Sequence, residues 1–69
     1  MDRQSVSSSN IGAIGYDPGA MMLEIQFNNG ALYQYDNVPA GVHADLMSAG
    51  SHGSYFSANI RNQYPTRLM

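Results

Sequence analysis

The sequence predicts an α+β fold: a three-stranded antiparallel sheet (a β-meander) followed by two short helices packed on one face of the sheet. Two patterns lead to this prediction. Apolar and polar residues alternate in the first half of the chain, and apolar residues recur at helical spacing in the second half. The chain has 69 residues, enough for one small domain. We expect residues 1–9 to be a flexible or edge segment, 10–65 the domain, and 66–69 a tail.

The first expected strand lies in "NIGAIGYD", where Ile14 and Tyr16 alternate around Gly15. Its two glycines indicate close backbone approach or a bulge. "DPGA" follows, and Pro18 and Gly19 occupy the second and third positions of a predicted type II turn.

The second strand signal is the strongest in the chain, because "MMLEIQF" alternates strictly before the turn "NNG". The length of that turn decides which way the next strand faces. A two-residue loop would put Tyr33 and Tyr35 on the polar face of the preceding strand. A three-residue loop pairs Ile25 with Tyr33 and Leu23 with Tyr35, and places Gly30 at the left-handed position of the loop. Burial favours the three-residue loop.

The first helix is predicted over residues 37–50, because Val42, Leu46 and Ala49 recur at helical spacing. Pro39 suits its first turn and Gly50 its C-terminal end.

Phe56 and Ile60 form the apolar stripe of a second helix, and Pro65 excludes Tyr64 from helical conformation. Ser51 or Ser54 is the expected N-cap of this helix. The alternative for Ser54 is that its hydroxyl and the neighbouring N–H groups bind an anion.

Composition limits the possible ligands. The chain has three Arg, no Lys and a formal net charge of -2, so it lacks the basic excess of proteins that bind long nucleic acids. It has no Cys, which removes disulfides and thiolate metal sites, and we expect a homo-oligomer to support so small a core. No apolar run has membrane-spanning length and no signal-peptide pattern occurs, so we expect a cytoplasmic location and no membrane partner.

Several stretches resemble the KTSC domain in order and spacing: "SSSNIGAIGYD", "LEIQFNNGALYQYDNVP" and "GSYFSANIRNQY". That family occurs at the carboxyl end of some lysyl-tRNA synthetases and as stand-alone proteins of bacteria and phages. The resemblance covers about residues 7–64 and implies a role in RNA binding, in a bacterial or phage-infected cell.

Tyr33 and Tyr35 are the first candidate ligand-binding residues, because aromatic rings on a sheet can stack on bases. The alternative is that they wall the core and present their hydroxyls at its rim, and the predicted register favours this alternative. Tyr16, Tyr55 and Tyr64 are further candidates for stacking.

Arg61 follows the apolar stripe of the second helix by one position and should point away from the core. It either binds a phosphate or stacks on a ring, or it pairs with one of three carboxylates: Asp17, Asp36 or Asp45. Arg67 and Arg3 would extend it into a small basic patch.

Catalytic and metal chemistry have little support in the sequence. His43 and His52 lack metal-ligand spacing and are expected to be solvated, and no nucleophile–base set is present. We therefore expect no enzyme, no metal and no cofactor. The function expected is a binding module for nucleic acid (RNA or a single strand) or a nucleotide, such as a phage protein that sequesters a nucleotide.

The alternative function is a protein-interaction or self-assembly module. Met21, Met22 and Met47 lie outside the clear core periods and suggest adaptable apolar surface, and the first segment could pair as an edge strand with another chain.

Overall fold

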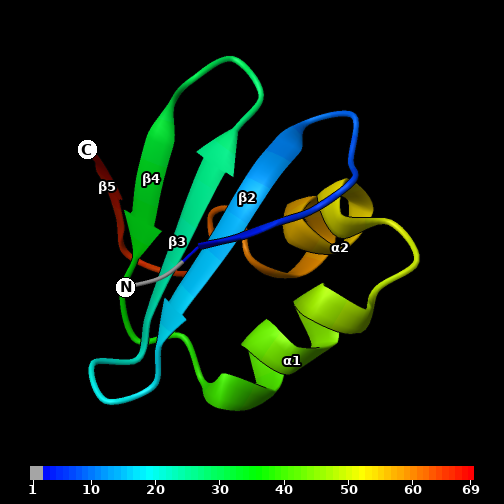
Figure 1. Ribbon diagram of the computed structural model, residues 1–69. Coiled ribbons are helices and arrows are strands. Elements are labelled where there is room, and N and C mark those ends of the chain that lie inside the picture. Colours follow the sequence, from blue (N-terminus) through cyan, green and yellow to red (C-terminus); the bar gives the residue numbers. More distant parts are fainter. Residues whose placement is uncertain (1–2) are drawn as a thin grey trace.

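A computed structural model, which describes residues 3–69, contains one antiparallel sheet with both helices on the same face (Figure 1). The α+β class and the two helices on one face are confirmed. The sheet has five strands in the order β1-β2-β3-β4-β5, where three were expected. The elements are β1 (Arg3–Ser5), β2 (Ile11–Asp17), β3 (Met22–Phe27), β4 (Leu32–Tyr35), α1 (Ala40–Ser48), α2 (His52–Asn59) and β5 (Thr66–Leu68).

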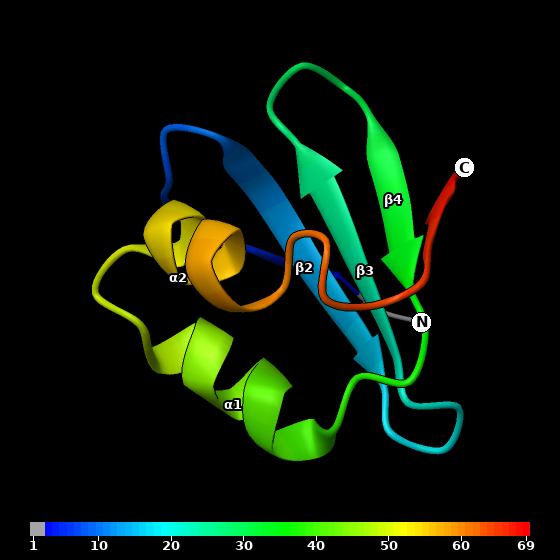
Figure 2. The same cartoon turned by 180° about the vertical axis from the view of Figure 1, so that it is seen from behind.

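The two additional strands are the edges of the sheet. β1 pairs with β2, which agrees with the edge alternative for the first segment. Residues 66–69 were expected to be a tail, and this is corrected: β5 pairs with β4, and the Met69 N–H donates to the Leu32 carbonyl at 2.8 Å. After α2 the chain returns to the free edge of β4 (Figure 2). The backbone groups of β4 supply hydrogen-bond partners for the three exposed residues of β5.

A bulge in β2 fixes how the first long strand faces the core. Ile11 pairs with Phe27 and Ile14 with Ile25, although Ile11 and Ile14 are three residues apart. The extra residue between the two pairings is accommodated around Gly12, as the glycines of this strand predicted. Both isoleucines consequently face the helices and are fully buried.

The turn between β2 and β3 differs from the predicted type II turn. Gly19 does not adopt positive φ, which that turn requires, whereas Met21 does, at 54°. The Asp17 carboxylate accepts hydrogen bonds from the N–H groups of Gly19 (3.0 Å) and Ala20 (3.3 Å). This side chain organises the turn in place of the backbone.

The β3–β4 hairpin has the predicted three-residue loop. Leu23 pairs with Tyr35 and Ile25 with Tyr33. The Phe27 N–H donates to the Ala31 carbonyl at 2.8 Å, and Gly30 has φ 93°. Both tyrosines therefore share the face that carries the helices.

Both helices begin close to the predicted positions. Pro39 is the N-cap of α1, and Ser51 is the N-cap of α2, where its hydroxyl accepts from the Ser54 N–H at 3.3 Å. The core lies between the helices and the sheet, and its fully buried side chains are Ile11, Ile14, Leu23, Ile25, Val38, Leu46 and Ile60. Within residues 3–69, no helix has the length and apolar character needed to cross a membrane.

Candidate ligand-binding cleft

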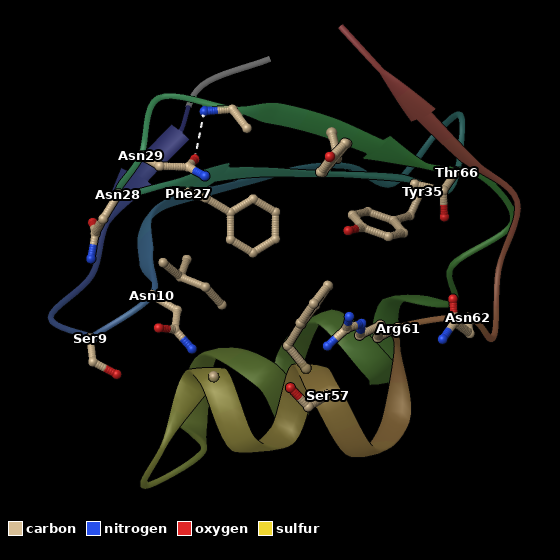
Figure 3. A pocket seen from close by; sticks show the side chains of 15 residues that line it. Ser9, Asn10, Phe27, Asn28, Asn29, Tyr35, Ser57, Arg61, Asn62 and Thr66 are labelled. Atoms are coloured by element: carbon tan, nitrogen blue, oxygen red, sulfur yellow. Dashed lines mark hydrogen bonds between the residues drawn. The ribbon is translucent and has the colours of Figure 1, made fainter.

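A cleft of about 650 Å³ opens between the helix-bearing face of the sheet and α2 (Figure 3). The β3–β4 hairpin forms one wall, and α2 with the loop after it forms the other. Three of the predicted site residues, Tyr33, Tyr35 and Arg61, line this cleft together. Its volume lies within the range of small-molecule sites, about 300–1,000 Å³.

Aromatic rings form the floor of the cleft. Phe27 meets Tyr33 edge to face, with ring centroids 5.6 Å apart, and meets Phe56 at 5.5 Å. Tyr35 packs on Phe56 in the same way at 5.6 Å. Phe56 and Tyr35 are buried, whereas Phe27 and Tyr33 are half-buried and leave part of their rings open to a ligand.

Tyr35 places a polar group at the bottom of the cleft. Its side chain is 3% exposed, and burial, followed by the neighbouring Tyr33, raises its pKa to about 12, with Arg61 acting in the opposite direction. The hydroxyl is therefore protonated throughout the physiological range. It forms no hydrogen bond with another residue of 3–69. No fully enclosed side-chain oxygen or nitrogen in that range lacks a partner, so this hydroxyl must reach the open cleft.

Arg61 differs from the other two arginines in its pairing within residues 3–69. The guanidinium of Arg67 pairs with Asp36 at 2.8 Å, and that of Arg3 pairs with Glu24. Among residues 3–69, which include all three arginines, Arg61 forms no ion pair. It lines the cleft, and its side chain extends into the cleft on the α2 side (Figure 3).

The expected basic patch does not form. Arg67 pairs across the strands with Gln34, and Arg3 pairs with Gly15. Because side chains alternate along a strand, both arginines lie on the face of the sheet opposite the helices. Arg61 is on the helix side, so the sheet separates it from Arg3 and Arg67.

Amide and hydroxyl groups ring the cleft, and sequence reasoning missed them because it treated the asparagines as turn residues. Asn10, Asn28 and Asn29 lie at one end, with Arg61, Asn62 and Thr66 at the other (Figure 3). Asn29 accepts from the Ala31 N–H and Asn28 donates to the Ser8 carbonyl, each at 3.0 Å. The one available signal was the "NN" pair beside a strand whose apolar face carries Phe27.

Comparison with known proteins identifies the fold. The KTSC domain model matches residues 7–64. The chain belongs to the KTSC domain family. The crystal structure of a KTSC domain protein from Yersinia pestis superimposes with a TM-score of 0.97 at 47% identity, covering 99% of this chain and 96% of that one.

Relatives of this KTSC domain occur alone and within larger enzymes. An uncharacterized protein of Stutzerimonas stutzeri is 39% identical over 64 residues, which is 93% of this chain and 90% of that protein. A lysine–tRNA ligase of Nostoc sp. is 38% identical over 56 residues, 81% of this chain but 10% of the ligase. The resemblance to this family is thereby confirmed.

Two other tyrosines predicted as ligand-binding lie outside the cleft of the KTSC domain. The Tyr16 hydroxyl donates to the Val38 carbonyl, and its ring stacks on His43 with centroids 4.6 Å apart. Tyr55 is half-buried on α2, where burial and the nearby Asp45 carboxylate raise its pKa. Both residues join elements of the fold and do not face the cleft.

His43 was expected to be solvated, and it is only partly so. Its ring is half-buried against Tyr16, and burial lowers its pKa below 6.5 because the charged form loses solvation.

Ser54 lies next to a second, shallower hollow of about 440 Å³, which Ser51 and Asn10 also line. Its backbone N–H is already taken by the Ser51 hydroxyl. Ser54 therefore belongs to the helix cap, and the cap interpretation accounts for it. Within residues 3–69, no group of three or more His, Cys, Asp or Glu is placed to hold a metal ion.

Proposed function

We propose that this KTSC domain is a non-enzymatic binding module that takes the base of a nucleotide, free or within a short single strand, into the cleft beside Tyr33. The observation that carries the proposal is a cleft with half-buried aromatic rings on one wall and, on the other, an arginine that forms no ion pair within residues 3–69. Stacking of a base on an aromatic ring is worth about 1–3 kcal/mol and tolerates any base.

Charge argues for a small ligand in preference to a long duplex. The chain has a net charge of -2, and two of its three arginines are engaged on the far side of the sheet. A long polyanion would find a single free guanidinium among residues 3–69, too few contacts for the phosphate-dominated binding of duplexes. A similar segment within a lysine–tRNA ligase agrees with RNA as one source of the ligand. The cytoplasm of a bacterium, infected by a phage or not, is the corresponding location.

Calorimetric titration at low salt tests the proposal with a short single-stranded RNA, the matching DNA strand, and linear and cyclic nucleotides. At least one of these should bind, and Tyr33→Leu should weaken binding about 5- to 150-fold, the equivalent of one lost stacking contact. Tyr55→Leu changes an equally half-buried tyrosine outside the cleft and should leave binding unchanged. The absence of heat with every ligand at high protein concentration would exclude this function.

A second candidate function is assembly through an edge of the sheet, as a protein-interaction module or homo-oligomer. The observation that favours it is β5, a short edge strand where Leu68 is 68% exposed and the adjoining Met69 is 62% exposed. Exposed edge strands offer unpaired backbone groups to another chain. Light scattering across a range of concentrations measures assembly, and Leu68→Lys should suppress it. Assembly of Leu68→Lys at the wild-type level would count against this edge.

A further inference from the structure

We propose that the Tyr35 hydroxyl and the Arg61 guanidinium form an anion subsite at one end of the cleft, and that this subsite holds a phosphate group of the ligand. The inference rests on the proposed function and deepens it, because it assigns the two ends of the cleft to different parts of one ligand. The base would lie toward the asparagines and the phosphate toward Arg61.

The first step of the argument is the Tyr35 hydroxyl. Tyr35 as a whole is only 3% exposed, and no enclosed side-chain oxygen or nitrogen of residues 3–69 lacks a partner, so its unpaired hydroxyl opens to the cleft. A tyrosine hydroxyl that opens to a cleft is free to donate a hydrogen bond to what the cleft holds. A ligand acceptor above it would satisfy the hydroxyl, and the cleft leads to this atom (Figure 3).

The second step is charge. Arg61 and Tyr35 line the same end of the cleft (Figure 3). Both groups donate hydrogen bonds, and a guanidinium accepts none. No aspartate or glutamate is among the cleft residues that the structure describes. Two converging donors, one of them cationic and neither opposed by a carboxylate, select an anion with several acceptor oxygens.

The third step is the arrangement of the remaining polar groups. Asn62 and Thr66 lie beside Arg61, whereas the amides of Asn10 and Asn29 lie beyond the Phe27 ring at the opposite end (Figure 3). Amide side chains match the mixed donors and acceptors on the edge of a base. The aromatic floor between the two ends would then lie under the ring of the base. A phosphate at the Arg61 end is therefore compatible with a base at the other end.

The test compares three probes by calorimetry at low salt: adenosine, adenosine 5′-monophosphate and the dinucleotide ApA. The wild type should bind the monophosphate at least about tenfold more tightly than adenosine, the effect of a charge-assisted hydrogen bond. Tyr35→Phe, which keeps the buried ring, should reduce this preference about tenfold. Arg61→Gln should do the same and lower the salt dependence of binding by about one counterion. Neither variant should change the affinity for adenosine.

Matched controls exist for both variants. Tyr55→Phe removes a hydroxyl outside the cleft, and Arg67→Gln removes a cation on the far face of the sheet. Both should retain the preference for the monophosphate. Thermal unfolding of every variant shows whether the fold is kept.

The outcomes separate the two proposals. Equal binding of adenosine and its monophosphate by the wild type, or an unchanged preference in Tyr35→Phe and Arg61→Gln, overturns the anion subsite while base binding stands. No binding of any of the three probes overturns both. Tighter binding of ApA than of the monophosphate would assign the subsite to a phosphodiester within a strand. Tighter binding of the monophosphate would assign it to a terminal phosphate.

Discussion

At the scale of single residues, Glu24 shows how the sheet tolerates a buried charge. It is 7% exposed although it lies on the face without helices. The Gln34 amide donates to it at 3.0 Å, and the Arg3 guanidinium reaches it from two strands away across Gly15, a residue without a side chain to obstruct it. The Gln34 hydrogen bond and Arg3 lower the pKa of Glu24 despite the opposing effect of burial.

Gln34→Leu should reduce the free energy of unfolding by about 1–3 kcal/mol at neutral pH, because a buried carboxylate loses its donor. Since the folded-state pKa of Glu24 is lowered from 4.5, this stabilisation is complete above that value and disappears as the pH falls through the folded-state pKa. Urea unfolding of wild type and variant over this pH range measures it. Gln26 lies on the same face of β3 as Glu24, so Gln26→Leu is the control and should reduce the free energy of unfolding by less than Gln34→Leu. An equal loss in both variants would contradict the role of Gln34.

His43 provides a second prediction from a single side chain. Burial against Tyr16 lowers its pKa from 6.5, so the folded state favours the neutral imidazole. Its contribution to stability is complete above about pH 6.5 and decreases as the pH falls through the folded-state pKa. His43→Phe keeps a stacking ring that cannot titrate, and should flatten this part of the stability profile.

Thermal melting between about pH 7 and about pH 5 follows the effect of His43 without protonating Glu24 extensively. His52→Phe is the matched control, and it should keep the wild-type slope. A wild-type slope in His43→Phe would show that another group titrates in this range.

At the scale of elements, the β3–β4 hairpin demonstrates what the pattern of residues can predict. Leu23, Ile25 and Phe27 needed apolar neighbours, and the three-residue loop supplied Tyr33 and Tyr35 in the correct register. The β2–β3 turn was mispredicted because Pro18 and Gly19 suggested a backbone turn, whereas the Asp17 side chain accepts from the N–H groups of Gly19 and Ala20. Local propensity could not decide between these two solutions.

Gly30 and Gly41 test backbone conformation separately from packing. A methyl group added to either glycine would meet nothing within 4 Å, but Gly30 has φ 93° and Gly41 lies within α1. Gly30→Ala should cost about 1–2 kcal/mol because L-residues disfavour left-handed conformation. Gly41→Ala should stabilise by about 0.5–1 kcal/mol through helix propensity. Chemical denaturation measures both, and a change of the same sign in the two variants would contradict the conformational explanation.

At the scale of the whole molecule, the site was predicted less completely than the fold. Tyr33, Tyr35 and Arg61 were proposed from the sequence and do line one cleft. The cleft itself arises from segments far apart in the chain, since Asn10, Asn28 and Thr66 come to line one cleft only after the sheet and α2 have packed. The ion pairs that engage Arg3 and Arg67 likewise depend on the order of the strands. Such long-range placement has no local periodic signal.

β5 had no such signal either, because Thr66–Leu68 is exposed and too short to show alternation. Its position is nevertheless important for the molecule: it covers the edge of β4, which carries Tyr33 and Tyr35, and Thr66 closes one end of the cleft. Removal of residues 66–69 would expose the β4 edge and open the cleft. Unpaired strand edges promote association between chains.

Truncation after Pro65 should therefore lower the free energy of unfolding by about 1–3 kcal/mol through lost backbone hydrogen bonds. It should also increase self-association above that of the wild type at equal concentration. Denaturation and light scattering measure the two effects. Arg67→Gln is the control, since it keeps β5 but removes an ion pair whose Arg67 side chain is 54% exposed, a type of pair worth about 0–1 kcal/mol. If the truncated chain matched this control in both measurements, β5 would not protect the sheet.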